Sequence, residues 1–158
     1  MGDMRRLTVG VLVALAVGAL LAACRPGPVA DPGAGPDESG DASGAVIGHQ
    51  PVGEELAWVE SRTREAGVYV KKFGDHRLVL IAMGERPTAG YGVVVDRVAT
   101  SEDGWVIDVR FIEPAPGDIV AQVITYPYEV VKIADDGCGV TVRDVTGEEP
   151  VELAVTVE

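Results

Sequence analysis

The chain has 158 residues, of which 47% are apolar and 5% aromatic, and its formal net charge is −12 at pH 7. This length predicts one domain with additional segments. The negative charge disfavours nucleic acid and anionic lipid headgroups as partners, because an acidic surface repels both.

Residues 1–23 predict an export signal. Arg5 and Arg6 precede the uncharged run Leu7–Ala23, which is shorter than the about 20 residues of a spanning helix. The following ending, Leu21–Cys24, resembles the lipobox of bacterial lipoproteins. The resemblance implies that the Cys24 thiol is joined to diacylglycerol and becomes the mature N-terminus. We therefore expect an extracytoplasmic protein that is held at the cell membrane by acyl chains on Cys24.

Residues 24–50 predict a disordered tether. They are rich in Pro, Gly, Ala, Ser and Asp and contain no aromatic residue, so they cannot build a core. A flexible coil of about 26 residues reaches roughly 25–30 Å. Lipidation of Cys24 and a disulfide with Cys138 exclude each other, since both use the same thiol. The export signal favours lipidation.

Residues 54–158 predict a single all-β domain. Apolar and polar residues alternate in Trp105–Phe111 and again in Val151–Val157, which is typical of half-buried strands. A two-residue turn, Gly74-Asp75, predicts a hairpin between Val68–Phe73 and His76–Met83. Ser101–Gly104 similarly joins Tyr91–Val98 to Trp105–Ile112.

The predicted strands leave little room for crossover helices. A short helix over Glu54–Glu65 is ambiguous, since Trp58 and the short length weaken the helical pattern. Parallel strands need a dozen or more connecting residues. We therefore expect an antiparallel β-sandwich or a partly open barrel.

Two segments interrupt the strand pattern. Gly84–Tyr91 predicts a rigid loop, because Pro87 fixes its own φ and holds Arg86 extended. The second is Pro127, inside the apolar run Ile119–Ala134. Proline cannot donate to a central ladder, so this run predicts an edge strand or two strands joined at a kink. Such an edge could accept a partner's extended segment.

These segments resemble a known family. Gly84–Tyr91, Glu113–Gly117 and Gln122–Tyr128 together look like the C-terminal domain of the PrcB family, small bacterial lipoproteins described as subunits of a surface protease complex. Ala89 stands where a second glycine is expected in that pattern. The resemblance covers roughly residues 68–135 and implies a non-catalytic assembly role beside an exported protease.

Other functions are weighed against this one. The Pro87–Tyr91 segment is also similar to a loop of chagasin-type inhibitors of cysteine proteases, so inhibition is the alternative, and an envelope binding module unrelated to proteases is a third. The candidate partner-binding residues are Arg86, Pro87, Thr88, Tyr91, Tyr126, Pro127 and Tyr128. The competing interpretation is a structural loop, in which Tyr91 buries its ring and Thr88 hydrogen-bonds the turn.

Catalytic and metal-binding patterns are not apparent. The sequence lacks a Gly-x-Ser-x-Gly elbow, and His49 and His76 have no third clustered ligand, so both are interpreted as solvated residues. Asp135–Gly139 lacks the spacing of a calcium loop and predicts a hairpin turn. We expect no catalysis, no cofactor, no metal and no small-molecule substrate.

Overall fold

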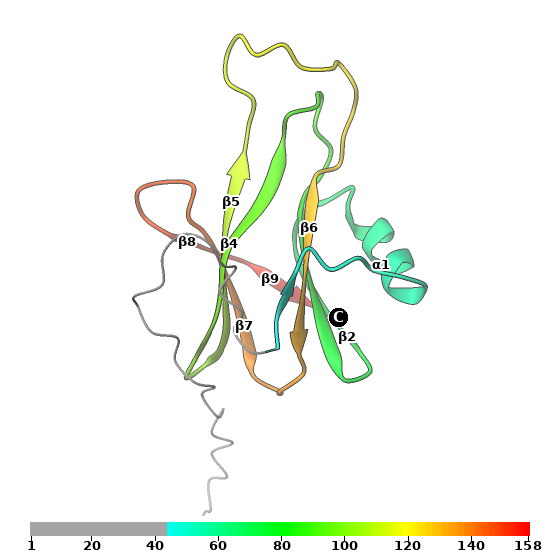
Figure 1. The fold of residues 1–158 in the computed structure, drawn as a ribbon, viewed down its shortest axis with the longest axis vertical. Coiled ribbons are helices and arrows are strands. Elements are labelled where there is room, and N and C mark those ends of the chain that lie inside the picture. The colour runs from blue at the N-terminus through cyan, green and yellow to red at the C-terminus, as the bar shows by residue number, and fades with distance from the viewer. Residues whose placement is uncertain (1–43) are drawn as a thin grey trace, which may run out of the picture.

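The computed structural model describes residues 44–158, so the predicted signal, Cys24 and most of the predicted tether lie outside the described residues. Figure 1 shows two layers of strands that face each other, with one helix outside them. The elements are β1 (Val46–Ile47), α1 (Glu54–Arg62), β2 (Ala66–Phe73), β3 (His76–Met83), β4 (Gly92–Ser101), β5 (Gly104–Ile112), β6 (Tyr128–Ala134), β7 (Gly139–Asp144), β8 (Val151–Leu153) and β9 (Val155–Val157).

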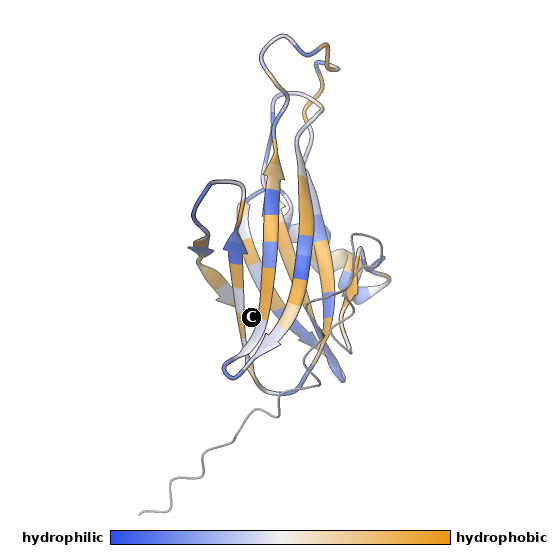
Figure 2. Cartoon of the chain, turned by 60° about the vertical axis from the view of Figure 1, so that its left-hand side comes forward, coloured by the Kyte–Doolittle hydropathy of each residue, from blue (hydrophilic) through white to orange (hydrophobic). Residues whose placement is uncertain are grey.

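The strands form two sheets, which confirms the predicted all-β sandwich. The first sheet has the order β1-β6-β3-β2-β9 and the second has the order β4-β5-β7-β8. Alternating hydrophilic and hydrophobic bands run along the strands in Figure 2. This alternation lets one face of each sheet enter the shared core while the other face meets solvent or α1.

Strand β3 lies at the centre of the packing because both of its faces are covered. Val79 and Ile81 face the second sheet, in the cluster between the sheets, and Leu78 and Leu80 face Trp58 of the helix. All four β3 side chains have no exposed surface. The double coverage explains why β3 has a continuous apolar run where a half-buried strand would alternate.

Both predicted hairpins are confirmed. In β2–β3, Phe73 pairs with His76 across the two-residue turn. In β4–β5, Ser101 pairs with Gly104. The register of β4 shifts between Val95 and Arg97.

The prediction of purely antiparallel sheets is wrong at two places. Strand β7 pairs in parallel with β5, and β9 pairs in parallel with β2. The rule about long connections still holds, because the chain between β5 and β7 passes through β6 in the opposite sheet. Strand β6 of the other sheet thus connects two parallel strands, as a crossover helix does in α/β folds.

Three local predictions also need correction. The stretch Val151–Val157 is two strands, since β8 joins the second sheet and β9 joins the first, with Ala154 between them. Pro127 precedes β6 and lies in neither an edge strand nor a kink between two strands. Asp135–Gly139 connects strands of different sheets, so it is a turn but not a hairpin.

The folded part begins earlier than the predicted boundary at residue 54. Val46 and Ile47 pair with Lys132 and Val131 of β6. The last residues assigned to the tether therefore belong to the first sheet.

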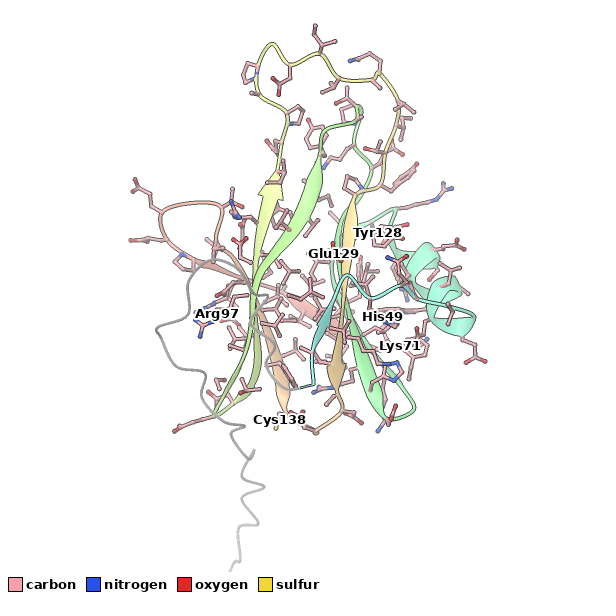
Figure 3. The ribbon with its side chains drawn as sticks, viewed as in Figure 1. His49, Lys71, Arg97, Tyr128, Glu129 and Cys138 are labelled. Atoms are coloured by element: carbon pink, nitrogen blue, oxygen red, sulfur yellow. The ribbon has the colours of Figure 1, made fainter. Side chains whose placement is uncertain are left out.

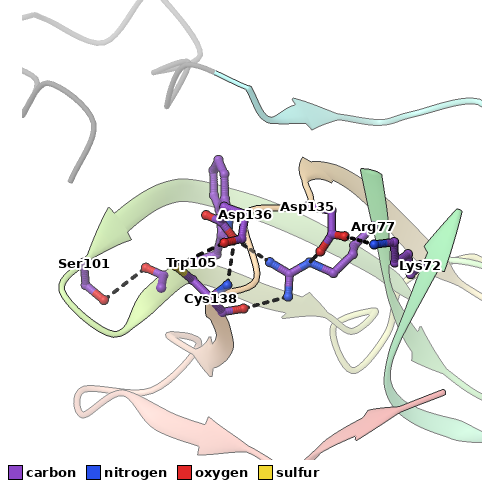
Figure 4. Close-up of polar contacts among 8 residues, drawn as sticks. Lys72, Arg77, Ser101, Trp105, Asp135, Asp136 and Cys138 are labelled. Atoms are coloured by element: carbon purple, nitrogen blue, oxygen red, sulfur yellow. Dashed lines mark hydrogen bonds and ion pairs between the residues drawn. The ribbon is translucent and has the colours of Figure 1, made fainter. Parts of the chain in front are cut away.

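One end of the sandwich, which we call the turn end, carries the β4–β5 and β6–β7 turns and is closed by polar contacts around Arg77. Arg77 donates to Asp136 at 2.8 Å and to the carbonyl of Cys138 at 2.7 Å, and its Nε lies 3.4 Å from Asp135. The other oxygen of Asp136 accepts from Trp105 Nε1 at 2.9 Å. Figure 4 shows how these contacts join β3, β5 and the β6–β7 turn.

Candidate functional site

The opposite end of the sandwich, the loop end, holds both segments that the sequence singled out. The loop pair consists of residues 84–91, which follow β3, and residues 113–127, which connect β5 to β6. It extends beyond the sheets at the top of Figure 1. Figure 3 places Tyr128 near this end and Cys138 at the turn end.

Backbone hydrogen bonds lock the two loops together. Arg86 N donates to Thr125 O at 2.8 Å, and Thr125 N donates back to Arg86 O at 3.0 Å. Farther out, Ala89 N donates to Ala121 O at 3.0 Å, and the Thr125 hydroxyl donates to the Thr88 carbonyl at 2.9 Å. Segments 32 or more residues apart in sequence thus form one extension.

Two glycines permit this arrangement. Gly84 has a φ of +71°, and a Cβ there would lie 2.8 Å from the backbone nitrogen of Ala66. Gly90 has a φ of +94°, and its Cβ would lie 3.2 Å from side-chain atoms of Pro114 and Val120. Residues with a side chain rarely adopt such φ values, so both glycines of the predicted rigid loop are required by its shape.

The candidate side chains form two contacts within the loop pair. The guanidinium of Arg86 lies over the ring of Tyr91, 5.5 Å from its centre. The hydroxyl of Tyr126 donates to Glu85 at 3.1 Å, and Arg64 lies over its ring at 5.5 Å.

The other candidates are spread along the same end. The Pro127 carbonyl accepts from Met83 N at 2.9 Å. The backbone carbonyl of Thr88 accepts the hydrogen bond from Thr125. The structural interpretation expected a hydrogen bond from the Thr88 side chain instead. Pro87 and Tyr128 are exposed. Tyr91 packs partly against the core, as that interpretation expected, so the loop has structural contacts as well as exposed groups.

The sequence interpretation missed an apolar surface on the loop pair. Ile119 is fully exposed, and Val123 and Ile124 are exposed by 52% and 56%. They were interpreted as part of a strand because they belong to an apolar run. The nearby Pro116-Gly117 turn and Pro127 were the available signals that this stretch leaves the sheet.

A pocket opens between the sheets just below the loop pair. Its volume is about 740 Å³, and its lining includes the buried core residues Val68, Ile81 and Met83. Arg86 and Glu113 supply charged groups to the same lining. The pocket therefore joins the candidate loop to the core.

The two histidines are not the solvated residues that the sequence suggested. His49 Nε2 lies 2.9 Å from one oxygen of Glu55, and His76 Nε2 lies 2.7 Å from the other. All three side chains are less than one-fifth exposed. The hydrogen bond with His49 is the largest cause that lowers the pKa of Glu55. In residues 44–158, no group of three His, Cys, Asp or Glu side chains could hold a metal ion.

Cys138 is half-buried and disulfide-bonded. Residues 44–158 contain no second cysteine. Within the same range, no helix is both long enough and apolar enough to cross a bilayer.

The fold and the loop pair place the protein in the class of all-β sandwiches, with an extension at one end that backbone hydrogen bonds hold in place. The family follows from comparison. Residues 77–134 match the family model described as PrcB C-terminal, and this range runs from β3 through β6 and includes both loops. Residues 77–134 are therefore similar to the PrcB C-terminal domain, as the resemblance indicated. No curated protein and no solved structure matches the chain.

Proposed function

We propose that this protein is a lipid-anchored, non-catalytic subunit that binds an exported protease through the loop pair. This proposal rests on the exposed apolar surface of Ile119, Val123 and Ile124. The surface lies on an extension whose two loops exchange a pair of backbone hydrogen bonds. A rigid, exposed apolar surface can bind a partner without a large ordering cost. The matched family, whose members are described as protease-complex subunits, supports a protease as that partner.

The position of the loop pair supports anchoring from the other end. Gly44, the first described residue, packs near Ala134 and Trp105 at the turn end. Strand β6 has seven residues, so the two ends are separated by about 20 Å. A chain tethered through Cys24 would keep its loop pair clear of the point of attachment, so that it can contact proteins in or near the same membrane.

The partner is tested by affinity isolation of the full-length protein from detergent-solubilised membranes. We expect an exported protease in stoichiometric amount with the wild type and its loss with Ile119→Asp. Val52→Asp is the matched control, since Val52 is also an exposed aliphatic residue, 71% accessible, but precedes α1. Isolation of no protease contradicts the proposal. Loss of peptidase activity on addition of the protein would favour the inhibitor alternative.

The anchor is tested by mass spectrometry of the same preparation. We expect a mature N-terminal Cys24 that carries a diacylglycerol thioether, and release of the protein from membranes by Cys24→Ser. Lipidation of Cys24 requires that the disulfide of Cys138 is either absent from the mature chain or formed with another molecule, because one thiol cannot form both bonds. A Cys24–Cys138 disulfide in the mature chain would contradict the proposal.

A further inference from the structure

The pocket at the loop end contains an arginine whose charge is not balanced by a neighbouring carboxylate. Arg62, Arg77 and Arg86 each have a buried Nε atom without a hydrogen-bond partner in the described residues. Arg62 still forms an ion pair with Glu158, and Arg77 with Asp135 and Asp136. No described carboxylate forms an ion pair with Arg86.

Leaving a guanidinium partly desolvated is unfavourable unless another group compensates it. A buried polar atom without a partner is destabilising, because it loses its hydrogen bonds to water. The contact with Tyr91 compensates the face of the guanidinium but satisfies none of its N–H donors. The guanidinium of Arg86 therefore has N–H donors available for an anion. A carboxylate matches the planar arrangement of these donors, because it can accept two parallel hydrogen bonds.

A carboxylate of the protein is also available in this pocket. Glu113 is exposed at the pocket and forms no hydrogen bond or ion pair recorded within residues 44–158. Asp144 lines the pocket too, but it accepts from the backbone of Thr146 at 2.8 Å. The pocket thus offers a cation and an anion that do not pair with each other.

The rest of the lining is apolar. The apolar side chains in it are Val68, Ile81, Met83, Phe111 and Leu153. A volume of about 740 Å³ falls in the range of about 300–1,000 Å³ that is typical of small-ligand sites. An occupant that combines apolar groups with one negative and one positive charge would complement all three kinds of group in this lining.

We infer that this pocket binds a short peptide with free ends and apolar side chains. The C-terminal carboxylate pairs with Arg86, the N-terminal ammonium pairs with Glu113, and the side chains contact the partly exposed Phe111 and Leu153. A fatty acid would leave Glu113 without a partner, and a capped peptide would leave both charged groups without one. Arg86 and Glu113 belong to the loop pair, but the proposed protease contact rests on Ile119, Val123 and Ile124 at its tip, so peptide binding and protease binding are tested separately.

The inference is tested by calorimetric titration of the full-length protein in detergent micelles with the tripeptide Leu-Val-Leu. We expect saturable binding that falls at least about tenfold when the peptide is N-acetylated and C-amidated. Equal binding of the free and capped peptides, or no binding of the free peptide at millimolar concentration, would overturn the inference. This comparison uses only the wild-type protein, so it does not depend on how a variant folds.

Two variants assign the charged contacts. Arg86→Gln should reduce affinity for the free peptide about tenfold and remove its preference over the C-amidated form. Glu113→Gln should remove the preference over the N-acetylated form.

Matched controls separate these contacts from general charge effects. Arg64→Gln removes another arginine that stacks on a tyrosine at 5.5 Å but is outside the pocket, and Glu102→Gln removes an exposed glutamate at the turn end. Both should bind the free peptide as the wild type does. Equal losses in the pocket variants and the controls would contradict the assignment.

Discussion

The turn end and the loop end of the sandwich each hold a half-buried arginine in opposite surroundings. At the turn end, Arg77 contacts Asp135, Asp136 and the carbonyl of Cys138. At the loop end, Arg86 contacts the ring of Tyr91 and no described carboxylate. The turn end is closed by its own groups, whereas the loop end leaves donors and apolar surface available.

The glycines at the two ends show the same difference. A Cβ on Gly104 would lie 2.2 Å from the carbonyl oxygen of Gly139, where β5 and β7 approach each other. A Cβ on Gly117, in the loop pair, would meet nothing within 4 Å. Gly84 at the base of the loop pair is also tightly enclosed, and Gly137 at the turn end is not, so the difference holds between Gly104 and the tip of the loop pair.

Gly104→Ala should lower the free energy of unfolding by about 3–5 kcal/mol, because a backbone clash in a paired strand cannot be relieved by a rotamer change. Gly117→Ala should cost only the strain of its φ of +99°, about 1–2 kcal/mol. Urea unfolding followed by tryptophan fluorescence measures both. Similar losses would show that the two ends are equally constrained.

Arg77→Met should cost about 3 kcal/mol, since it removes the partner of two carboxylates and keeps most of the side-chain packing. Arg86→Met should cost at most about 1 kcal/mol, the value of the lost contact with Tyr91. The same unfolding experiment compares them. If Arg86→Met is as destabilising as Arg77→Met, Arg86 serves the fold and the peptide site loses its basis.

Thr125→Val should cost about 1 kcal/mol, because it removes the hydroxyl that donates to Thr88. The effect should remain local, so hydrogen exchange should quicken at the Ala89 amide, which bonds across the loops, more than at β3 amides. Thr100→Val is the control, since Thr100 is an exposed strand threonine without a recorded side-chain hydrogen bond. Unchanged exchange at Ala89 would show that the loops are not locked by this contact.

Asp135 should give the smallest effect, seen in acid. Its hydrogen bond with Lys72, and then its attraction to Lys72 and Arg77, lower its pKa from 3.8. A lowered pKa in the folded state stabilises the protein above the unfolded value and loses that contribution as the pH falls through the folded value. Asp135→Asn should therefore flatten the decline of unfolding free energy below about pH 4. Lys72→Met should produce part of the same change, and an unaltered decline in both variants would contradict this role.

The sequence predicted the features that depend on neighbouring residues. Gly74-Asp75 defines the β2–β3 turn locally, so this turn was predicted correctly. Alternation in Trp105–Phe111 identified the buried apolar side chains of this strand but not Asp108, which is buried as well. Strand pairing across the layers depends on distant contacts. The parallel pairs and the change of sheet at Ala154 therefore could not be predicted from local patterns.

The candidate site was predictable to a similar extent. Proline and glycine spacing identified both loops, and their pairing through Arg86 and Thr125 joined them in the structure. The exposure of Ile119 was missed because an apolar run is typical of a buried strand as well. The pocket was missed because its lining comes from several strands that are distant in sequence.

The most direct test of the loop end as the binding end is photocrosslinking from single positions in the native membrane. A photoreactive amino acid is placed at Ile119 in one protein and at Val52 in another, two exposed aliphatic positions on different parts of the fold. We predict a crosslink to an exported protease from position 119 and none from position 52. A crosslink from position 52 alone, or equal crosslinks from both, would contradict the account.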